Sequence, residues 1–232
     1  MIYLYTGTPG SGKSLDMARV IWYQSTSHPV ICNFPVTLPP KKMANFQFWR
    51  DEEFTVSHLV DFANEYWHGR PVKEDTILLF IDEAQIYFNS RDWSSKCRKD
   101  WIRFFSGHRH YGYCIIMACQ IDTMLDKQIR ALVEIQVIHR KINNYGWRGL
   151  LLRLLFFAPT LFVKVSLYYQ QKMKLSSSMF RYSKKFASIY DSYATSFFDG
   201  SDFRGQLEQC ESKDGELEPE KGKGAINGYK TN

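Results

Sequence analysis

The sequence lacks the cysteine spacing that disulfide frameworks and zinc sites have in common. It contains five cysteines, an odd number, and no two of them are spaced as CxxC; they are Cys32, Cys97, Cys114, Cys119 and Cys210. This pattern disfavours a disulfide-stapled scaffold and a zinc-binding module, and it favours a reducing compartment.

The chain also lacks a signal peptide and an uninterrupted hydrophobic run. Its first residues have neither the basic segment nor the apolar stretch of a signal peptide, so we expect the catalytic part in the cytosol. Residues 149–165 are rich in apolar side chains, but Arg153, Pro159 and Lys164 interrupt them, whereas a spanning helix needs about 20 apolar residues. Beyond the proline, apolar and polar residues alternate, which predicts a β-hairpin turning near residues 158–160 and not a membrane contact.

What the chain does contain is the composition of a globular protein with a basic surplus. Hydrophobic residues make up 44% and charged residues 23%, which excludes a wholly disordered or fibrous chain. The 30 Lys and Arg outnumber the 24 Asp and Glu, which favours anionic partners such as nucleic acid, nucleotide or a membrane surface. Apolar periodicity ends near Gly200, so we expect a folded domain over residues 1–195 and a disordered polar tail over 196–232.

Apolar runs alternate with helical periodicities along the domain. The predicted strands cover residues 2–6, 30–34, 77–81, 113–118 and 134–142, and the predicted helices cover 13–25, 56–66, 97–108 and 123–133. Strands that alternate with helices need crossover connections. The expected fold class is therefore α/β, with a mainly parallel central sheet flanked by helices and followed by the C-terminal β-hairpin.

The first motif that carries chemistry lies between the first strand and the first helix. It matches G-x-x-x-x-G-K-[ST] at every fixed position and reads Gly7-Thr8-Pro9-Gly10-Ser11-Gly12-Lys13-Ser14. Glycines let the backbone N–H groups converge on phosphate oxygens, and the helix presents its positive end to the same anion. Lys13 would contact the β- and γ-phosphates, and Ser14 would bind Mg²⁺. The alternative is a chance glycine turn with a solvated lysine, but the strand and helix on either side favour the phosphate-binding (Walker A) loop.

The second motif is an acidic pair, Asp82-Glu83, directly after the apolar run 77–81. Such a pair lies at the carboxyl edge of the sheet, where open α/β folds bind ligands. We expect Asp82 to hold Mg²⁺, usually through water, and Glu83 to orient and deprotonate the attacking water, as in a Walker B motif. Alone, an acidic pair is more often a helix N-cap. Beside the phosphate loop it favours an ATP hydrolase over a kinase, which has less need of a second acid.

Three further residues are weaker candidates. Gln120 ends the strand over 113–118 and is our candidate sensor of the γ-phosphate, the alternative being a turn residue that bonds its own backbone. Arg109 and Arg130 are candidate arginine fingers toward a neighbouring subunit, although most arginines are simply solvated. We predict no metal site at the neighbouring histidines.

The order of these elements resembles the zonula occludens toxin (Zot) family, the assembly ATPases of filamentous phages. The resemblance rests on the phosphate loop near the N-terminus, the acidic strand ending in Phe80-Ile81-Asp82-Glu83-Ala84-Gln85, the turn Arg109-His110-Tyr111-Gly112, Gln120, and Leu125-Asp126-Lys127-Gln128-Ile129-Arg130. It spans about residues 1–195 and ends near Tyr190-Asp191-Ser192-Tyr193.

The resemblance implies an ATP- and Mg²⁺-dependent motor at the cytoplasmic face of the host inner membrane, which exports single-stranded phage DNA as coat protein is added. It also implies a homo-oligomer, a hexameric ring, with an inner-membrane assembly partner. Family members typically have a transmembrane helix after the ATPase domain, and this chain departs from that pattern, which leaves direct anchoring open. The preference for ATP over GTP rests on the resemblance alone.

Two other functions remain open at this point. One is a nucleotide-gated scaffold with slow turnover, and the other is a DNA translocase or packaging ATPase of the same superfamily. A run of basic residues suits the second as a phosphate-tracking surface, although such runs are usually only solvated; it comprises Lys172, Lys174, Arg181, Lys184 and Lys185.

Overall fold

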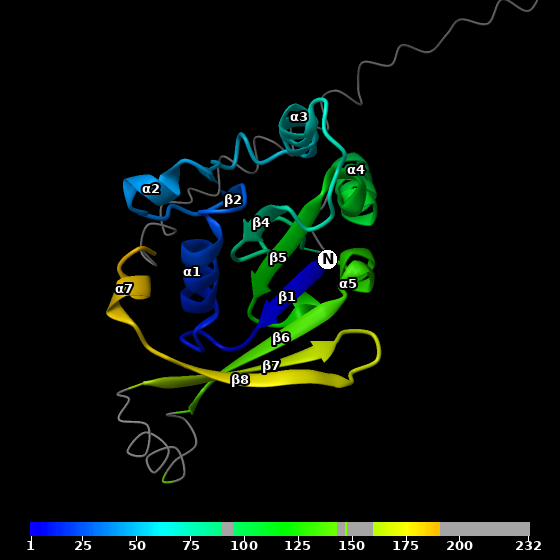
Figure 1. The fold of residues 1–232 in the computed structure, drawn as a ribbon. Coiled ribbons are helices and arrows are strands. Elements are labelled where there is room, and N and C mark those ends of the chain that lie inside the picture. Colours follow the sequence, from blue (N-terminus) through cyan, green and yellow to red (C-terminus); the bar gives the residue numbers. More distant parts are fainter. Residues whose placement is uncertain (90–94, 143–146, 148–159, 191–232) are drawn as a thin grey trace, which may run out of the picture.

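A computed structural model describes residues 1–89, 95–142, 147 and 160–190. Its centre is an eight-stranded sheet with the order β3-β2-β4-β5-β1-β6-β7-β8 (Figure 1). The strands are β1 (Ile2–Thr6), β2 (Val30–Cys32), β3 (Phe46–Phe48), β4 (Ile77–Ile81), β5 (Tyr113–Cys119), β6 (Ile135–Lys141), β7 (Leu161–Tyr168) and β8 (Lys174–Arg181).

The six strands from β3 to β6 are parallel, and β7 and β8 add an antiparallel extension. β5 lies between β1, which leads into the glycine loop, and β4, which leads into the acidic pair. Every residue of β4 and β5 is buried, as expected for central strands that are covered on both faces. This order brings the carboxyl ends of β1, β4 and β5 to one edge of the sheet.

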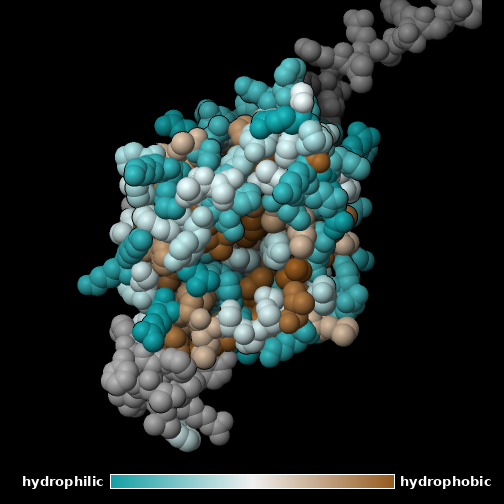
Figure 2. Space-filling model, in the orientation of Figure 1, coloured by the Kyte–Doolittle hydropathy of each residue, from teal (hydrophilic) through white to brown (hydrophobic). Residues whose placement is uncertain are grey.

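Helices cover both faces of the sheet (Figure 1). One side holds α1 (Lys13–Gln24), α2 (Pro40–Met43) and α7 (Lys184–Ala187), and the other holds α3 (Val56–Trp67), α4 (Ser95–Gly107) and α5 (Lys127–Leu132). Each face has its own hydrophobic core, one containing Ile21 of α1 and the other containing Leu59 of α3 and Phe105 of α4. Figure 2 shows mainly hydrophilic residues on the outside, with hydrophobic residues gathered in a hollow near the middle of that view.

The mainly parallel α/β fold is confirmed, with two local corrections in the parallel part. The second strand ends at Cys32 and not at residue 34. The predicted helix over 123–133 is wrong at its start, because the backbone is extended at Leu125 and Asp126. The Asp126 side chain then accepts the N–H groups of Gln128 and Ile129 and caps a new helix, α5.

The C-terminal part contains a hairpin of β7 and β8, whereas most of the turn predicted near 158–160 lies outside the described residues. β7 pairs with β6 along one edge and with β8 along the other, and the hairpin of β7 and β8 turns between Tyr168 and Lys174. Residues 158 and 159 lie outside the described residues, as does the tail over 196–232. None of the helices that the structure describes has both the length and the apolar character that a bilayer crossing requires.

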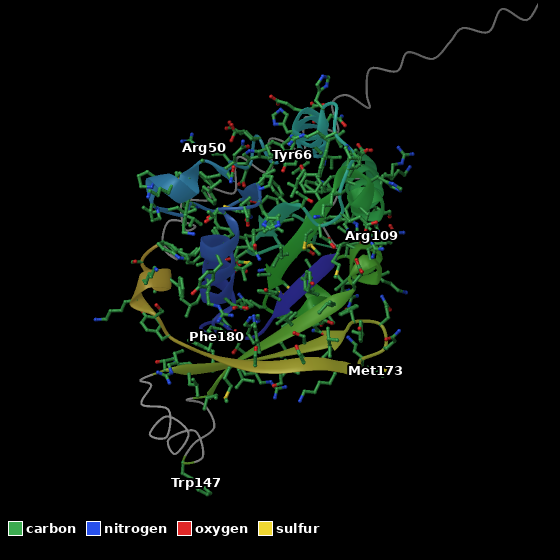
Figure 3. The ribbon with its side chains drawn as sticks, viewed as in Figure 1. Arg50, Tyr66, Arg109, Trp147, Met173 and Phe180 are labelled. Atoms are coloured by element: carbon green, nitrogen blue, oxygen red, sulfur yellow. The ribbon has the colours of Figure 1, made fainter. Side chains whose placement is uncertain are left out.

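The basic run of the C-terminal part does not form one patch in space. Lys172 and Lys174 lie at the β7–β8 turn, next to Met173 in Figure 3, whereas Lys184 and Lys185 lie on α7 beside α1. β8 separates the two groups by eight residues, or roughly 26 Å of extended chain. The five residues therefore do not form one compact cluster.

Candidate nucleotide site

The glycine loop between β1 and α1 has a backbone that only glycine accommodates easily. Gly7 and Gly12 have φ angles of +149° and +95°, values that L side chains rarely adopt. A Cβ atom at Gly7 would lie 2.4 Å from the backbone oxygen of His139, and one at Gly12 would lie 2.8 Å from the ring of Phe162. The loop is thus wrapped tightly against β6 and β7.

Lys13 turns its side chain back over this loop. Its ammonium group donates to the backbone oxygen of Gly7 at 2.7 Å and lies 3.4 Å from that of Thr8, and the side chain is buried. The hydroxyl of Ser11 is buried in the same loop without a hydrogen-bond partner among the described residues. A buried unpaired donor, a lysine ammonium and the N-terminus of a 12-residue helix are donors that suit the phosphates of a nucleotide.

The acidic pair lies directly beside the loop. The Ser14 hydroxyl donates to Oδ2 of Asp82 at 2.9 Å, although 68 residues separate them in the chain. Asp82 is almost fully buried and follows the last residue of β4. A hydroxyl and a carboxylate next to a phosphate cradle form the oxygen donor set that Mg²⁺ prefers, so these two residues fit the metal expected with the nucleotide.

Glu83 stands at the edge of this site in an unusual backbone conformation. Its φ is +47°, in the left-handed region that is uncommon for residues other than glycine. Its backbone N–H donates to Oδ1 of Asp82 at 2.9 Å, and the Gln85 amide donates to its carboxylate. Glu83 is only partly buried, so its carboxylate is accessible to a water molecule or substrate.

Two residues that sequence reasoning missed also hold Asp82. The Asn33 amide bonds the backbone of Asp82 in both directions: its Oδ1 accepts the Asp82 N–H at 2.8 Å, and its Nδ2 donates to the carbonyl at 3.0 Å. The Tyr190 hydroxyl donates to Oδ2 of Asp82 at 2.8 Å. Burial, together with the Asp82 carboxylate, raises the pKa of Tyr190, so the phenol stays protonated and acts as the donor.

Gln120 lies where the sequence predicts it, at the carboxyl end of β5. Its backbone oxygen accepts the N–H of Gly7 at 3.2 Å, which ties the end of β5 to the start of the phosphate loop. The Gln120 side chain is partly exposed. The structure thus brings Gln120, Lys13, Ser14, Asp82 and Glu83 to one edge of the sheet.

Neither candidate arginine lies at the phosphate loop of its own chain. Arg109 donates to Glu134 at 2.7 Å, and this ion pair raises the pKa of the guanidinium. Glu134 precedes β6 at the opposite edge of the sheet, and Figure 3 places Arg109 beside α5, across the molecule from the loop that joins β1 and α1. Arg130 lies on α5, and its charge acts on the Tyr169 hydroxyl, a group that itself donates to Asp122.

Sequence reasoning also missed a buried ion cluster that lies between α1 and strands β6 and β7, next to the phosphate loop. Asp16 of α1 is fully enclosed and contacts Arg19 at 2.9 Å, Lys164 at 2.8 Å and Nε2 of His139 at 3.1 Å. Burial alone would raise the pKa of Asp16, but the His139 hydrogen bond and the Lys164 charge outweigh it and lower this pKa. The cluster joins α1 to β6 and β7, and Arg19 also lies over the ring of Phe180.

Comparisons with known proteins show which family and which relatives the chain resembles. The family model "Zonular occludens toxin (Zot)" matches residues 1–196. The "Gene 1 protein" of Enterobacteria phage I2-2 is 39% identical over 68 residues, which cover 29% of this chain and 19% of that protein. The "Putative assembly protein ORF301" of Pseudomonas phage Pf3 is 26% identical over 152 residues, which cover 65% of this chain and 44% of that protein. The chain thus spans less than half the length of these relatives.

Among solved structures, the "ATPase Domain of G40P" is similar in fold. Its TM-score is 0.53 at 9% identity, over 82% of this chain and 84% of that one. At this identity the likeness concerns the fold alone.

Proposed function

Since the chain belongs to the zonular occludens toxin family, we propose that it is a Mg²⁺-dependent ATPase that drives the assembly of filamentous phage particles and the export of their single-stranded DNA. The observation that carries this proposal is the 2.9 Å contact between Ser14 and Asp82 beside the Lys13 cradle. The Pf3 relative is named as an assembly protein, which supports the assembly role.

Each residue of the site would have a distinct part in hydrolysis. Lys13 and the N-terminus of α1 would bind and orient the phosphates. Ser14 and Asp82 would hold Mg²⁺, which neutralises the charge that builds on the phosphate oxygens. Glu83 would orient a water molecule and accept its proton, and Gln120 would contact the γ-phosphate from the end of β5.

Fast turnover would require a neighbouring copy of the chain. The two candidate arginine fingers are Arg109 and Arg130. Both have their contacts away from the phosphate loop of their own chain. We propose that one of them acts in a ring on the site of the next subunit, where positive charge stabilises the transition state. A homo-oligomer with the domain over residues 1–195 as its unit follows from this proposal. On the basis of the family alone, we also propose a location at the cytoplasmic face of the host inner membrane.

The Glu83→Gln variant tests the assigned base. Hydrolysis should fall by roughly 10²–10⁴-fold, while nucleotide binding should persist, because the carboxylate acts on the water in the transition state and contributes little to holding the phosphates. Glu65→Gln, on the exposed surface of α3, is the matched control and should hydrolyse ATP at the wild-type rate. Equal turnover in Glu83→Gln and wild type would refute the assignment of the base.

A nucleotide-gated scaffold and a motor differ in whether DNA and coat protein stimulate the rate of ATP turnover. Because Arg109 and Arg130 contact Glu134 and Tyr169 and not the loop of their own chain, we expect a low basal rate that rises when subunits assemble on single-stranded DNA with coat protein. A turnover rate that stays basal under those conditions, with nucleotide binding intact, would favour the scaffold.

A further inference from the structure

Tyr190 is held beside the nucleotide site by contacts that do not involve its hydroxyl. The backbone oxygen of Ile189 accepts the N–H of Thr37 at 2.9 Å, and Tyr190 forms an antiparallel bridge with Val36. The Tyr190 ring packs edge-on against Phe34, with 5.2 Å between the ring centroids, and Ile189 is buried in the core under α1. The chain therefore delivers this side chain to the end of β4 in a fixed position.

The hydroxyl of Tyr190 completes the set of donors around one carboxylate. Oδ2 of Asp82 accepts from Tyr190 at 2.8 Å and from Ser14 at 2.9 Å, while Oδ1 accepts from the backbone of Glu83 at 2.9 Å. Ser14 and Glu83 belong to the two nucleotide motifs themselves. Tyr190 comes from 108 residues beyond Asp82, from an element with no motif.

We infer that Tyr190 is a positioning residue of the magnesium site, which fixes the orientation of the Asp82 carboxylate through its hydroxyl. The inference rests on the proposed function, because it concerns the metal that accompanies the nucleotide. A group that donates a hydrogen bond to a metal-binding carboxylate restricts the rotation of that carboxylate. The carboxylate is then already oriented when the metal binds. Loss of such a partner typically weakens metal affinity by about 10–100-fold.

The same geometry separates metal binding from phosphate binding. The hydrogen bonds of Lys13 are with the loop, at Gly7 and Thr8, whereas that of the Tyr190 hydroxyl is with Asp82. Removal of the Tyr190 hydroxyl should therefore change the metal requirement of the site and leave the affinity for metal-free nucleotide in place.

The test is the Tyr190→Phe variant, compared with the wild type and with Tyr182→Phe. The phenylalanine ring keeps the packing on Phe34, so the thermal midpoint should stay within a few degrees; Tyr182→Phe removes a hydroxyl from an exposed residue of the same segment. A fluorescent ATP analogue is titrated into each protein at a series of Mg²⁺ concentrations and in EDTA. For Tyr190→Phe the Mg²⁺ concentration at half-maximal binding should rise about tenfold or more, with affinity in EDTA unchanged.

The possible outcomes distinguish this inference from the proposed function. If the folded wild type binds no nucleotide at any Mg²⁺ concentration, the proposed function fails. If the wild type binds and Tyr190→Phe has the same Mg²⁺ midpoint as Tyr182→Phe, the proposed function stands and the positioning role is overturned. A loss of affinity that is equal with Mg²⁺ and in EDTA would also overturn it, because the hydroxyl would then act on the loop and not on the metal. If Tyr190→Phe does not fold, Phe34→Leu replaces it, because this variant loosens the packing of the Tyr190 ring but keeps the hydroxyl. The Mn²⁺ affinity of Phe34→Leu is then compared with that of the wild type. Equal affinities would contradict the positioning role.

Discussion

Asp16 illustrates how a single buried charge supports the phosphate loop. It lies on the first turns of α1 and is surrounded by Arg19, His139 and Lys164. A buried carboxylate is costly unless cations and hydrogen bonds compensate for the lost water. The arrangement therefore holds α1 in one position relative to β6 and β7, which is the position that the loop needs.

The Asp16→Asn variant should destabilise the fold in a pH-dependent way. The pKa of Asp16 is lowered in the folded state, so its contribution is present above the unfolded pKa of about 4 and is lost as the pH falls further. We expect the free energy of unfolding to drop by about 3–5 kcal/mol at pH 7, with a smaller difference from wild type below pH 4. Urea unfolding at pH 3, 5 and 7 measures this; a difference that does not depend on pH would contradict the charged role.

Apart from Gln120, the site residues that sequence reasoning identified are those that lie together in the chain. The phosphate loop and the pair Asp82-Glu83 each form a continuous motif after a strand, so residue types and spacing are enough to recognise them. Asn33, His139 and Tyr190 reach the site only through folding. The one local signal among them is Asn33, a polar residue that directly follows a buried strand on its way to the same edge of the sheet.

At the scale of elements, the hairpin of β7 and β8 is more than an addition to the sheet. Phe162 of β7 packs on Gly12 of the phosphate loop and stacks on Phe180 of β8, with 5.2 Å between the ring centroids. Lys164, on the same face of β7, bonds Asp16 of α1. The hairpin thus forms one wall behind the loop and the start of α1.

The Phe162→Ala variant should therefore affect stability and nucleotide binding together. A buried phenylalanine costs about 3–5 kcal/mol when it is truncated, and the loop loses its support at Gly12. Val163→Ala is the matched control, because successive residues of a strand point to opposite faces; it should lower stability by about 1 kcal/mol and leave nucleotide affinity unchanged. Chemical unfolding and nucleotide titration on both variants check this prediction. If Phe162→Ala binds nucleotide as tightly as the wild type, the hairpin does not support the loop.

Sequence patterns predicted best those elements whose residues are all buried in an apolar environment. β4 and β5 are apolar throughout and fully buried, so composition alone marks them. β8 is exposed at every residue except Phe180, and so its pattern carried no signal. The alternation after Pro159 predicts the strand β7 but does not indicate that β6 and β8 are its neighbours.

At the scale of the whole molecule, negative charge is confined to part of the chain. No Asp or Glu occurs in 17–50 or in 135–190, segments that supply most of α1, α2, β6–β8 and α7. Where α2 and α7 meet α1, Lys42 and Lys185 lie over the Trp22 ring, 5.3 and 4.1 Å from its centroid, and Tyr23 beside them is exposed. Cations beside an exposed aromatic ring suit the phosphates and bases of a single-stranded nucleic acid.

The paired variant Lys184→Glu/Lys185→Glu tests this surface. If both lysines contact phosphates, affinity for single-stranded DNA should fall, and the slope of log K against log salt should decrease by about 1.4, or about 0.7 for each contact. Lys99→Glu/Lys127→Glu, on α4 and α5 of the other side, is the matched control with the same change in net charge. Equal losses in both pairs would indicate that only the net charge matters, and a binding constant that does not vary with salt would contradict the surface.

The central claim is that the loop from Gly7 to Ser14 binds a magnesium nucleotide beside Asp82. Calorimetric titration of the folded protein with Mg²⁺ and a slowly hydrolysed ATP analogue tests it most directly. We expect saturable binding of one nucleotide per chain, at least about tenfold weaker in Lys13→Ala, because a charged donor to phosphate is lost. An absence of binding to the folded wild-type protein, or equal binding by Lys13→Ala, would contradict the claim.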